Sequence, residues 1–422
     1  MPENKKSNTA QWWGKYTESQ VHEKEKFLLL LYELCQGVEE PEQIAGRARL
    51  SLKDMIFSIC FKVYSQLSAR RFMSDLRKAH QEGLISHVEH FNSISNYLQL
   101  ESVTPVLQKI IEESSSPLKA VESVFAVDST GLGVPCHRKW YNRHKKRVQD
   151  RRAWRKLHCI CGVQTNIITM AEVSDGHAHD SPFFKGLVQQ TARRFQISEV
   201  SADAGYIAAH NQREVLLLGA VPYIAYRSNS SPYGRPKSSF YKRMLELFEQ
   251  RKPEFMEHYY RRNNIESTFF MIKARFGGFL RSKSERAQVN EALCKVICHN
   301  LCVLIQSMSE LGIEPVFYSP SSMEEEVRPN QSLLTKAIIQ ERLPALTTKV
   351  ALKEASEKRP VNKRPDADKT TQPLLPIFEK ENAELLNASS TETVNDNSAL
   401  KEALPSLKYG RRGMMGQQLL FL

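Results

Sequence analysis

The stretch Tyr259–Lys273, Y-Y-R-R-N-N-I-E-S-T-F-F-M-I-K, decides how the rest of the chain is interpreted. It contains neither Gly nor Pro, and its residues follow the period of an α-helix. One face, within about 60° on a helix of 3.6 residues per turn, is polar; it holds Tyr259, Arg262, Glu266 and Lys273. The adjoining face has the spacing of a buried surface; it holds Ile265, Phe269, Ile272 and Phe276. We therefore expect one helix that places Glu266 at the edge of a core, beside cations.

The net charge of +12 over 422 residues is concentrated rather than spread. Residues 312–422 hold 15 Lys/Arg and 15 Asp/Glu, so the excess lies in residues 1–311. Within it, His137–Lys156 holds ten Lys/Arg against one Asp. A concentrated basic patch favours a polyanionic partner, most simply nucleic acid, over a charge that only keeps the chain in solution.

Cysteine usage and hydropathy exclude two classes of protein. Eight Cys in a chain of this length form no disulfide framework, and none has the spacing of a zinc site. Cys294, Cys298 and Cys302 recur every four residues and are interpreted as small core residues. No apolar run approaches the length of a membrane span, and the first residues are polar, so an intracellular protein without a membrane partner is expected.

Residues 1–113 are predicted to form a helical N-terminal domain. Glu23–Gln36, Lys53–Leu67 and Ala69–Glu82 carry helical periodicity, and Ser114–Pro117 is interpreted as a boundary. The second and third of these helices, with basic residues on the third, are compatible with a helix-turn-helix. Many small helical domains share that pattern, so a DNA-binding role remains a hypothesis at this point.

Residues 119–311 are predicted to form an α/β domain, with a mixed sheet flanked by helices. Residues 123–133 are interpreted as a buried strand that ends at Asp128 in a Gly-containing turn. Arg155–Gln164 and Ile167–Val173 alternate as two antiparallel strands, and Glu199–Asp203 is a further strand. Further elements are expected at Asp180–Phe195, Ala208–Gly219, Val221–Tyr226, Ser239–Lys273 and Glu285–Leu311. Residues 312–422 have the composition of a low-complexity, mostly disordered tail.

Three carboxylates in these elements suggest a metal site. Asp128 and Asp203 each end a strand pattern, and Glu266 lies on the helix described above. Hard oxygen ligands suit Mg²⁺ or Mn²⁺, and two such ions can support in-line displacement at phosphorus. Taken singly, an aspartate at a strand end is more often a turn former or a helix cap, so the sequence pattern alone leaves convergence open.

The spacing Tyr259-x₂-Arg262-x₃-Glu266-x₆-Lys273 resembles the Tyr-Arg-Glu-Lys signature of a group of bacterial insertion-sequence DDE transposases. V-D-S-T at 127–130 and A-D-A-G-Y at 202–206 are similar to the two aspartate segments of that family. G-H-A-H-D-S at 176–181 resembles its His-Asp-Ser segment. The resemblance covers roughly residues 45–310. The intervals are 75 residues from Asp128 to Asp203 and 63 from Asp203 to Glu266, and the second leaves no room for the large β-rich insertion that some members of the family carry there.

The resemblance implies a ribonuclease-H-like core with the metal-binding catalytic triad Asp128, Asp203 and Glu266. It implies a bacterial, cytoplasmic and nucleoid-associated enzyme that nicks transposon ends and joins the 3′-hydroxyls to target DNA. The partners would be double-stranded DNA and further copies of the chain in a synaptic complex, with residues 1–113 bound to transposon ends. The expected DNA-binding residues are Tyr259, Arg262, Lys273, Arg138, Lys139, Arg143, Lys145, Lys146, Arg147, Arg151 and Arg152.

Several alternatives remain at the level of sequence. The chain could be a catalytically silent DNA-binding protein derived from such an enzyme, or a basic protein that binds structured RNA. His177-x-His179-Asp180 could ligate a transition metal, although a loop that starts the next helix explains it better. Aromatic residues within His137–Lys156 could stack on single-stranded DNA, although we favour phosphate contacts for its cations and core packing for Trp154. Tyr206 is expected to pack beside the site rather than act as a nucleophile.

Overall fold

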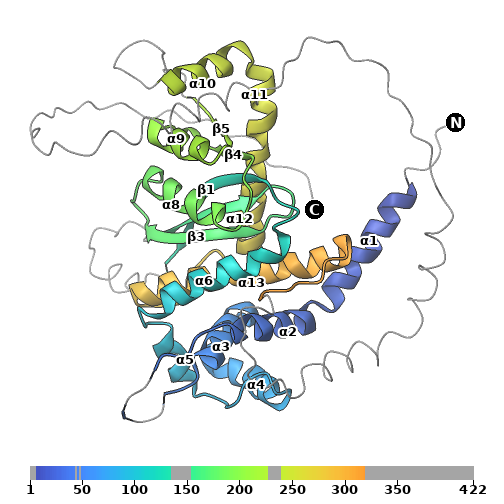
Figure 1. Ribbon diagram of the computed structural model, residues 1–422. Helices are drawn as coiled ribbons and strands as arrows, with labels where there is room; N and C mark the ends of the chain where they lie inside the picture. Colours follow the sequence, from blue (N-terminus) through green and yellow to red (C-terminus); the bar gives the residue numbers. More distant parts are fainter. Residues whose placement is uncertain (1–5, 43–44, 47–48, 135–153, 227–238, 319–422) are drawn as a thin grey trace, which may run out of the picture.

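The computed structural model describes residues 6–42, 45–46, 49–134, 154–226 and 239–318 (Figure 1). The basic residues from Arg138 to Arg152, which were predicted to bind DNA, therefore lie outside the described residues. The same holds for all but the first seven residues of the predicted low-complexity tail. The predictions for both segments stay predictions.

Helices precede, flank and follow a five-stranded sheet. The N-terminal helices are α1 (Lys6–Val21), α2 (Glu23–Gln36), α3 (Leu52–Ser65), α4 (Ala69–Gln81), α5 (Phe91–Tyr97) and α6 (Val103–Ser115). The strands are β1 (Val124–Gly133), β2 (Trp154–Gly162), β3 (Ile168–Asp175), β4 (Glu199–Ala202) and β5 (Val221–Ile224). The later helices are α8 (Ser181–Ala192), α9 (Ala209–Leu217), α10 (Ser239–Gln250), α11 (Lys252–Tyr259), α12 (Asn263–Phe276) and α13 (Glu285–Leu311). Short 3₁₀ turns are η1 (Ser116–Leu118), η2 (Ala204–Tyr206) and η3 (Tyr260–Arg262).

The sheet is mixed, which confirms the predicted α/β class. Its strand order is β3-β2-β1-β4-β5. β1, β2 and β3 are antiparallel neighbours, as expected, whereas β1, β4 and β5 run parallel. The prediction of a turn after Asp128 was wrong, because β1 continues to Gly133 and pairs with β2 as far as Trp154. Pairing along β2 overrides the local preference of Gly131 and Gly133 for turns.

The two faces of the sheet are covered by different apolar clusters. Alternate side chains of β1 point to opposite faces: Ala126 joins a cluster with α12, α13 and the N-terminal helices, whereas Val127 joins one with α8. α13 begins and ends where it was predicted, and its three cysteines are buried core residues. By length and composition this helix could cross a membrane, but 83% of the relevant window is buried inside the protein. α13 is therefore the central helix of the core.

The N-terminal helices α2, α3 and α4 confirm the predicted helical segments, and α6 extends into the predicted boundary and ends there at Ser115. Ser114 and Ser115 end α6 in buried positions, where their hydroxyls donate to Ile111 O and Glu112 O at 2.8 and 2.7 Å. Those hydrogen bonds satisfy two polar groups that would otherwise favour a turn. Side chains from both sides of this point share one apolar cluster, and the division into domains stays a prediction.

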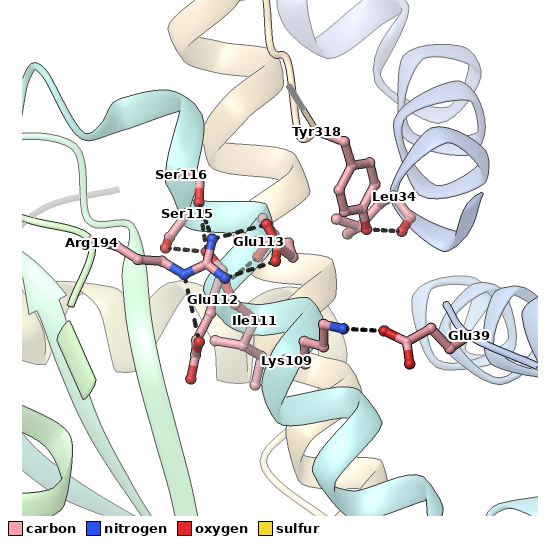
Figure 2. Close-up of polar contacts among 11 residues, drawn as sticks. Leu34, Glu39, Lys109, Ile111, Glu112, Glu113, Ser115, Ser116, Arg194 and Tyr318 are labelled. Carbon is pink, nitrogen blue, oxygen red and sulfur yellow. Dashed lines mark hydrogen bonds and ion pairs between the residues drawn. The ribbon is translucent and has the colours of Figure 1, made fainter. Parts of the chain in front are cut away.

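An arginine joins the helical layer to the sheet layer (Figure 2). Arg194, which follows α8, donates from Nη1 and Nη2 to the two oxygens of Glu113 at 2.9 and 2.7 Å. Nη1 also donates to Ser116 Oγ at 3.0 Å, and Nε lies 3.5 Å from Glu112 Oε2. Beside this pair, Tyr318 donates from its hydroxyl to Leu34 O at 2.6 Å, so the chain after α13 returns to α2.

We expect Arg194→Met to lower the free energy of unfolding by about 2–3 kcal/mol, because Glu113 would be left largely buried without its partner. The Glu113 side chain is 11% exposed and that of Arg194 is 32% exposed. Urea unfolding measures the change. The neighbouring exposed residue supplies the control, since Arg193→Met should change the free energy by no more than about 0.5 kcal/mol. Equal effects of the two substitutions would contradict the assigned contact.

Candidate active site

Strand register brings the two predicted aspartates together. The last residue pair of the parallel β1–β4 ladder is Val127 and Ala202. Asp128 and Asp203 are the residues that directly follow this pair along the chain, so they leave the ladder side by side. Beyond this point β1 continues along β2, while the chain after β4 turns into η2. Asp203 starts that turn, since its Oδ1 accepts from Gly205 N at 2.8 Å.

The predicted single helix across Tyr259–Lys273 is interrupted. α11 ends at Tyr259, η3 occupies Tyr260–Arg262, and α12 begins at Asn263. In a 3₁₀ turn side chains three residues apart eclipse one another. Arg262 accordingly lies over the ring of Tyr259, with its guanidinium carbon 5.8 Å from the ring centroid. The side chains of Tyr259 and Arg262 therefore point in a different direction from the one that a continuous helix would give them. The interruption coincides with Asn263 and Asn264, which have low helix propensity.

The remainder of the stripe lies as predicted. The apolar face of α12 is buried at Ile265, Phe269, Ile272 and Phe276. Glu266 stands at the edge of this face with its side chain 58% exposed. Lys273 donates from Nζ to Thr130 Oγ1 at 2.6 Å, and burial lowers the pKa of its ammonium group. Because Thr130 follows Asp128 by two residues on β1, the face of α12 that carries Glu266 and Lys273 borders the strand that carries Asp128.

Arg262 connects two of the three carboxylates. Its Nη1 donates to Asp128 Oδ2 and its Nη2 to Glu266 Oε1, both at 2.7 Å. Burial raises the pKa of Asp128 to about 6, while the backbone N–H of Ser129 and the charge of Arg262 oppose the rise. The negative charges of Asp203 and Glu266 raise that pKa further. The predicted triad therefore forms one electrostatic cluster, with a guanidinium between two of its members.

These carboxylates have the chemistry of a divalent-cation site. Their oxygens are the hard ligands that Mg²⁺ and Mn²⁺ prefer. Asp128 is mostly buried, Asp203 lies beside it, and Glu266 is exposed enough to rotate. Within the described part of the chain, no three His, Cys, Asp or Glu side chains already stand close enough together to hold an ion. In the present arrangement Arg262 supplies the positive charge.

Asp180 belongs to a polar network that sequence reasoning missed. It was interpreted as part of a helix-starting loop or of a His-rich metal cluster. Its Oδ1 instead accepts from Ser129 Oγ at 2.8 Å and from Lys156 Nζ at 2.9 Å. His158 Nδ1 lies 3.5 Å away, and burial lowers the pKa of His158 to about 4. Strand alternation places Ser129 and His158 opposite one another on β1 and β2, which was the available signal.

The flanking residues fit supporting roles. Tyr206 is buried and packs against Phe184 with ring centroids 5.7 Å apart, as expected for a packing residue. Trp154 is partly buried, with its ring centroid 5.0 Å from that of His177. The basic residues at the described end of His137–Lys156 form ion pairs within the protein. Arg155 pairs with Asp175 and with Glu285, and Lys156 pairs with Asp180.

Comparison with known proteins finds one matching family model. Residues 119–301, which contain all three carboxylates, match the family model described as "Transposase DDE domain". A comparison with curated proteins finds no match. Among solved structures, the chain is similar to the piggyBac transposase synaptic complex with hairpin DNA, determined by cryo-EM. The identity is 11%, the TM-score is 0.36, and 84% of this chain and 89% of that chain are covered. Residues 119–301 are thus similar to the DDE domain of transposases.

Proposed function

We propose that the chain is a metal-dependent DNA strand transferase of the insertion-sequence type, with Asp128, Asp203 and Glu266 as its catalytic carboxylates. The observation that supports the proposal is the proximity of these residues. The register of β1 against β4 places the two aspartates side by side, and Arg262 donates hydrogen bonds to both Asp128 and Glu266. The mixed sheet supports a ribonuclease-H-like core. Synapsis of two transposon ends would require at least two copies of the chain.

The carboxylates would hold one or two Mg²⁺ or Mn²⁺ ions, which supply activation of a water or 3′-hydroxyl and charge stabilisation at the phosphate. Asp128 and Asp203 would be fixed ligands, because Asp128 lies within β1 and Asp203 directly follows β4. Glu266 would be the adjustable ligand, since it lies on α12 with an exposed side chain. Tyr259, Arg262 and Lys273 border the same site and would position the DNA backbone. The basic residues from Arg138 to Arg152 and the exposed basic residues of α4 are further proposed DNA contacts.

Cleavage of labelled duplex DNA tests this function. The substrate should carry the inverted repeats that flank the gene, and the full chain should be assayed with Mn²⁺. We expect nicking and joining by the unaltered protein and loss of both in Glu266→Ala, because Glu266 would be a ligand of the ion. Glu257→Ala, which removes an exposed carboxylate on the preceding helix, is the matched control and should stay active. Equal cleavage by unaltered protein and Glu266→Ala would refute the assignment.

One alternative keeps the fold but not the chemistry. A catalytically silent, transposase-derived protein would bind the same DNA with a steep dependence on salt, and would show no metal-dependent nicking. The presence of all three carboxylates, with Arg262 between Asp128 and Glu266, favours the enzyme. A structured-RNA-binding role would instead show as preference for RNA over duplex DNA in competition.

A further inference from the structure

Arg262 has an unusual position for a residue expected to contact DNA. Its guanidinium faces inward and bridges Asp128 and Glu266 with two hydrogen bonds of 2.7 Å. The Arg262 side chain is only 15% exposed. The guanidinium between these two carboxylates occupies the place of a divalent ion that both carboxylates would bind. The arginine and the ion would therefore compete for the same oxygens.

We propose that Arg262 closes the metal site of the DNA-free protein, and that a DNA phosphate opens it by drawing the guanidinium away from Asp128 and Glu266. This inference rests on the proposed function, since it takes the triad as the metal site. Arg262 is then a positioning residue that makes tight metal binding depend on bound DNA. Such an order would protect DNA from cleavage by a protein that is loaded with metal before it reaches its substrate.

The bridging pose contains a weakness that favours such an exchange. Among the described residues, Arg262 Nε is buried and has no hydrogen-bond partner. An unpaired buried donor costs free energy, so the pose is held by two of its N–H groups and opposed by a third. Phosphate accepts paired hydrogen bonds from a guanidinium as readily as carboxylate does. A phosphate beside Tyr259 could therefore take over the guanidinium and leave the carboxylates free for the ion.

The next residue along the chain behaves differently and supplies a control. Arg261 Nη1 donates to Glu199 Oε2 at 3.1 Å, and its side chain is 37% exposed. No contact joins it to Asp128 or Glu266 among the described residues. Removal of Arg261 or Arg262 changes the net charge equally and at almost the same place. Only the removal of Arg262 opens the site.

The test measures Mn²⁺ binding to the full chain without DNA, through loss of the electron paramagnetic resonance signal of free Mn²⁺. We expect Arg262→Gln to bind Mn²⁺ about tenfold or more tightly than the unaltered protein, because two charge-assisted hydrogen bonds no longer compete. Arg261→Gln should differ from the unaltered protein by less than about threefold. Arg262→Lys, which keeps the charge without the fork, should fall between them. Thermal melting checks that each variant is folded.

A DNA arm tests the order of binding. A short duplex of arbitrary sequence should tighten Mn²⁺ binding by the unaltered protein and leave that of Arg262→Gln unchanged. The same variant should bind the duplex more weakly, so its metal and DNA affinities move in opposite directions. A merely structural role for Arg262 would weaken both.

The outcomes separate this inference from the proposed function. If Arg262→Gln gains no more Mn²⁺ affinity than Arg261→Gln, while Asp128→Asn still abolishes binding, the closing role fails and the metal site stands. If Arg262→Gln binds tightly and adding Asp128→Asn leaves that binding intact, the ion sits elsewhere. In that case the closing role and the proposed triad both fail.

Discussion

Asp128→Asn is expected to reduce metal-dependent DNA cleavage by at least about 10³-fold, the largest effect on activity that we predict. Loss of one ligand charge at the point where β1 leaves β4 would remove several kcal/mol of transition-state stabilisation, at about 1.4 kcal/mol per factor of ten. The amide keeps the shape of the side chain and can still accept from Arg262. The measurement is the rate of nicking of labelled element-end DNA with Mn²⁺ under single-turnover conditions.

The same substitution should not destabilise the fold at neutral pH. Burial holds the pKa of Asp128 at about 6, above its ordinary value of 3.8. The folded state therefore binds more protons than the unfolded state in that interval, and stability falls as pH rises from about 3.8 to about 6. The amide of asparagine does not titrate, so the variant does not lose stability over this pH interval. Compared with the unaltered protein, the variant should gain stability between pH 4 and pH 7, with a melting temperature at pH 7 that is unchanged or higher by about 2–4 °C.

Asp180→Asn provides the contrast. Asp180 is held by Ser129 and Lys156 on the other face of β1, so its removal leaves an ammonium group without its carboxylate. We expect lower stability and only partial loss of cleavage, about 10- to 100-fold, which is typical of residues that support a site from behind. If Asp180→Asn proved as inactive as Asp128→Asn while melting normally, Asp180 would be as good a candidate ligand as Asp128, and its supporting role would be refuted.

Local periodicity was sufficient to predict the elements whose burial follows one face. The limits of α13 and the buried positions of α12 are of this kind, because regular apolar spacing survives almost any tertiary context. The ends of strands and helices were less predictable. The Gly131-Leu132-Gly133 segment has the composition of a turn, but pairing with β2 holds it in the sheet. Ser114 and Ser115 have the composition of a linker, but hydrogen bonds within α6 keep them helical.

The site required information that no local pattern contains. Asp128 and Asp203 are 75 residues apart, and only the register of β1 against β4 makes them neighbours. A shift of one residue would turn one of them to the opposite face of the sheet. The sequence also placed Arg262 on the polar stripe without indicating that it would face two carboxylates, because that depends on the 3₁₀ turn before α12. The resemblance predicted that these three carboxylates belong together, while the geometry shows that the cation Arg262 lies between Asp128 and Glu266.

Lys295→Met is expected to have the largest effect on stability, lowering the free energy of unfolding by about 3–5 kcal/mol. Lys295 is 1% exposed on α13 and donates from Nζ to Gly277 O at 2.6 Å and to Phe279 O at 2.8 Å. The loop that it holds follows α12 and pairs with β1, since Gly133 N donates to Gly278 O at 2.9 Å. Loss of the ammonium would remove the donor to these two carbonyls and loosen the loop between α12 and α13.

The contribution of Lys295 can be recognised from how the free energy of unfolding depends on pH. Burial lowers the pKa of Lys295 from 10.5 to about 8. Between these values the unfolded state binds more protons than the folded state, so the contribution of Lys295 to stability rises with pH from about 8 to about 10.5. Below pH 8 both states are protonated and this contribution is constant. In denaturant unfolding, the change in the free energy of unfolding from pH 7.5 to pH 10 should be more positive in the unaltered protein than in Lys295→Met.

The exposed Lys283, in the loop before α13, gives the matched control. Lys283→Met removes the same charge but no buried hydrogen bond, so it should keep the stability and the pH response of the unaltered protein to within about 0.5 kcal/mol. Because other lysines, tyrosines and cysteines titrate alike in the three proteins, their contributions cancel in the comparison. An identical pH response in Lys295→Met and Lys283→Met would mean that the Lys295 ammonium is not destabilised by burial. The hydrogen bonds of Lys295 to the loop would then offset the cost of its desolvation.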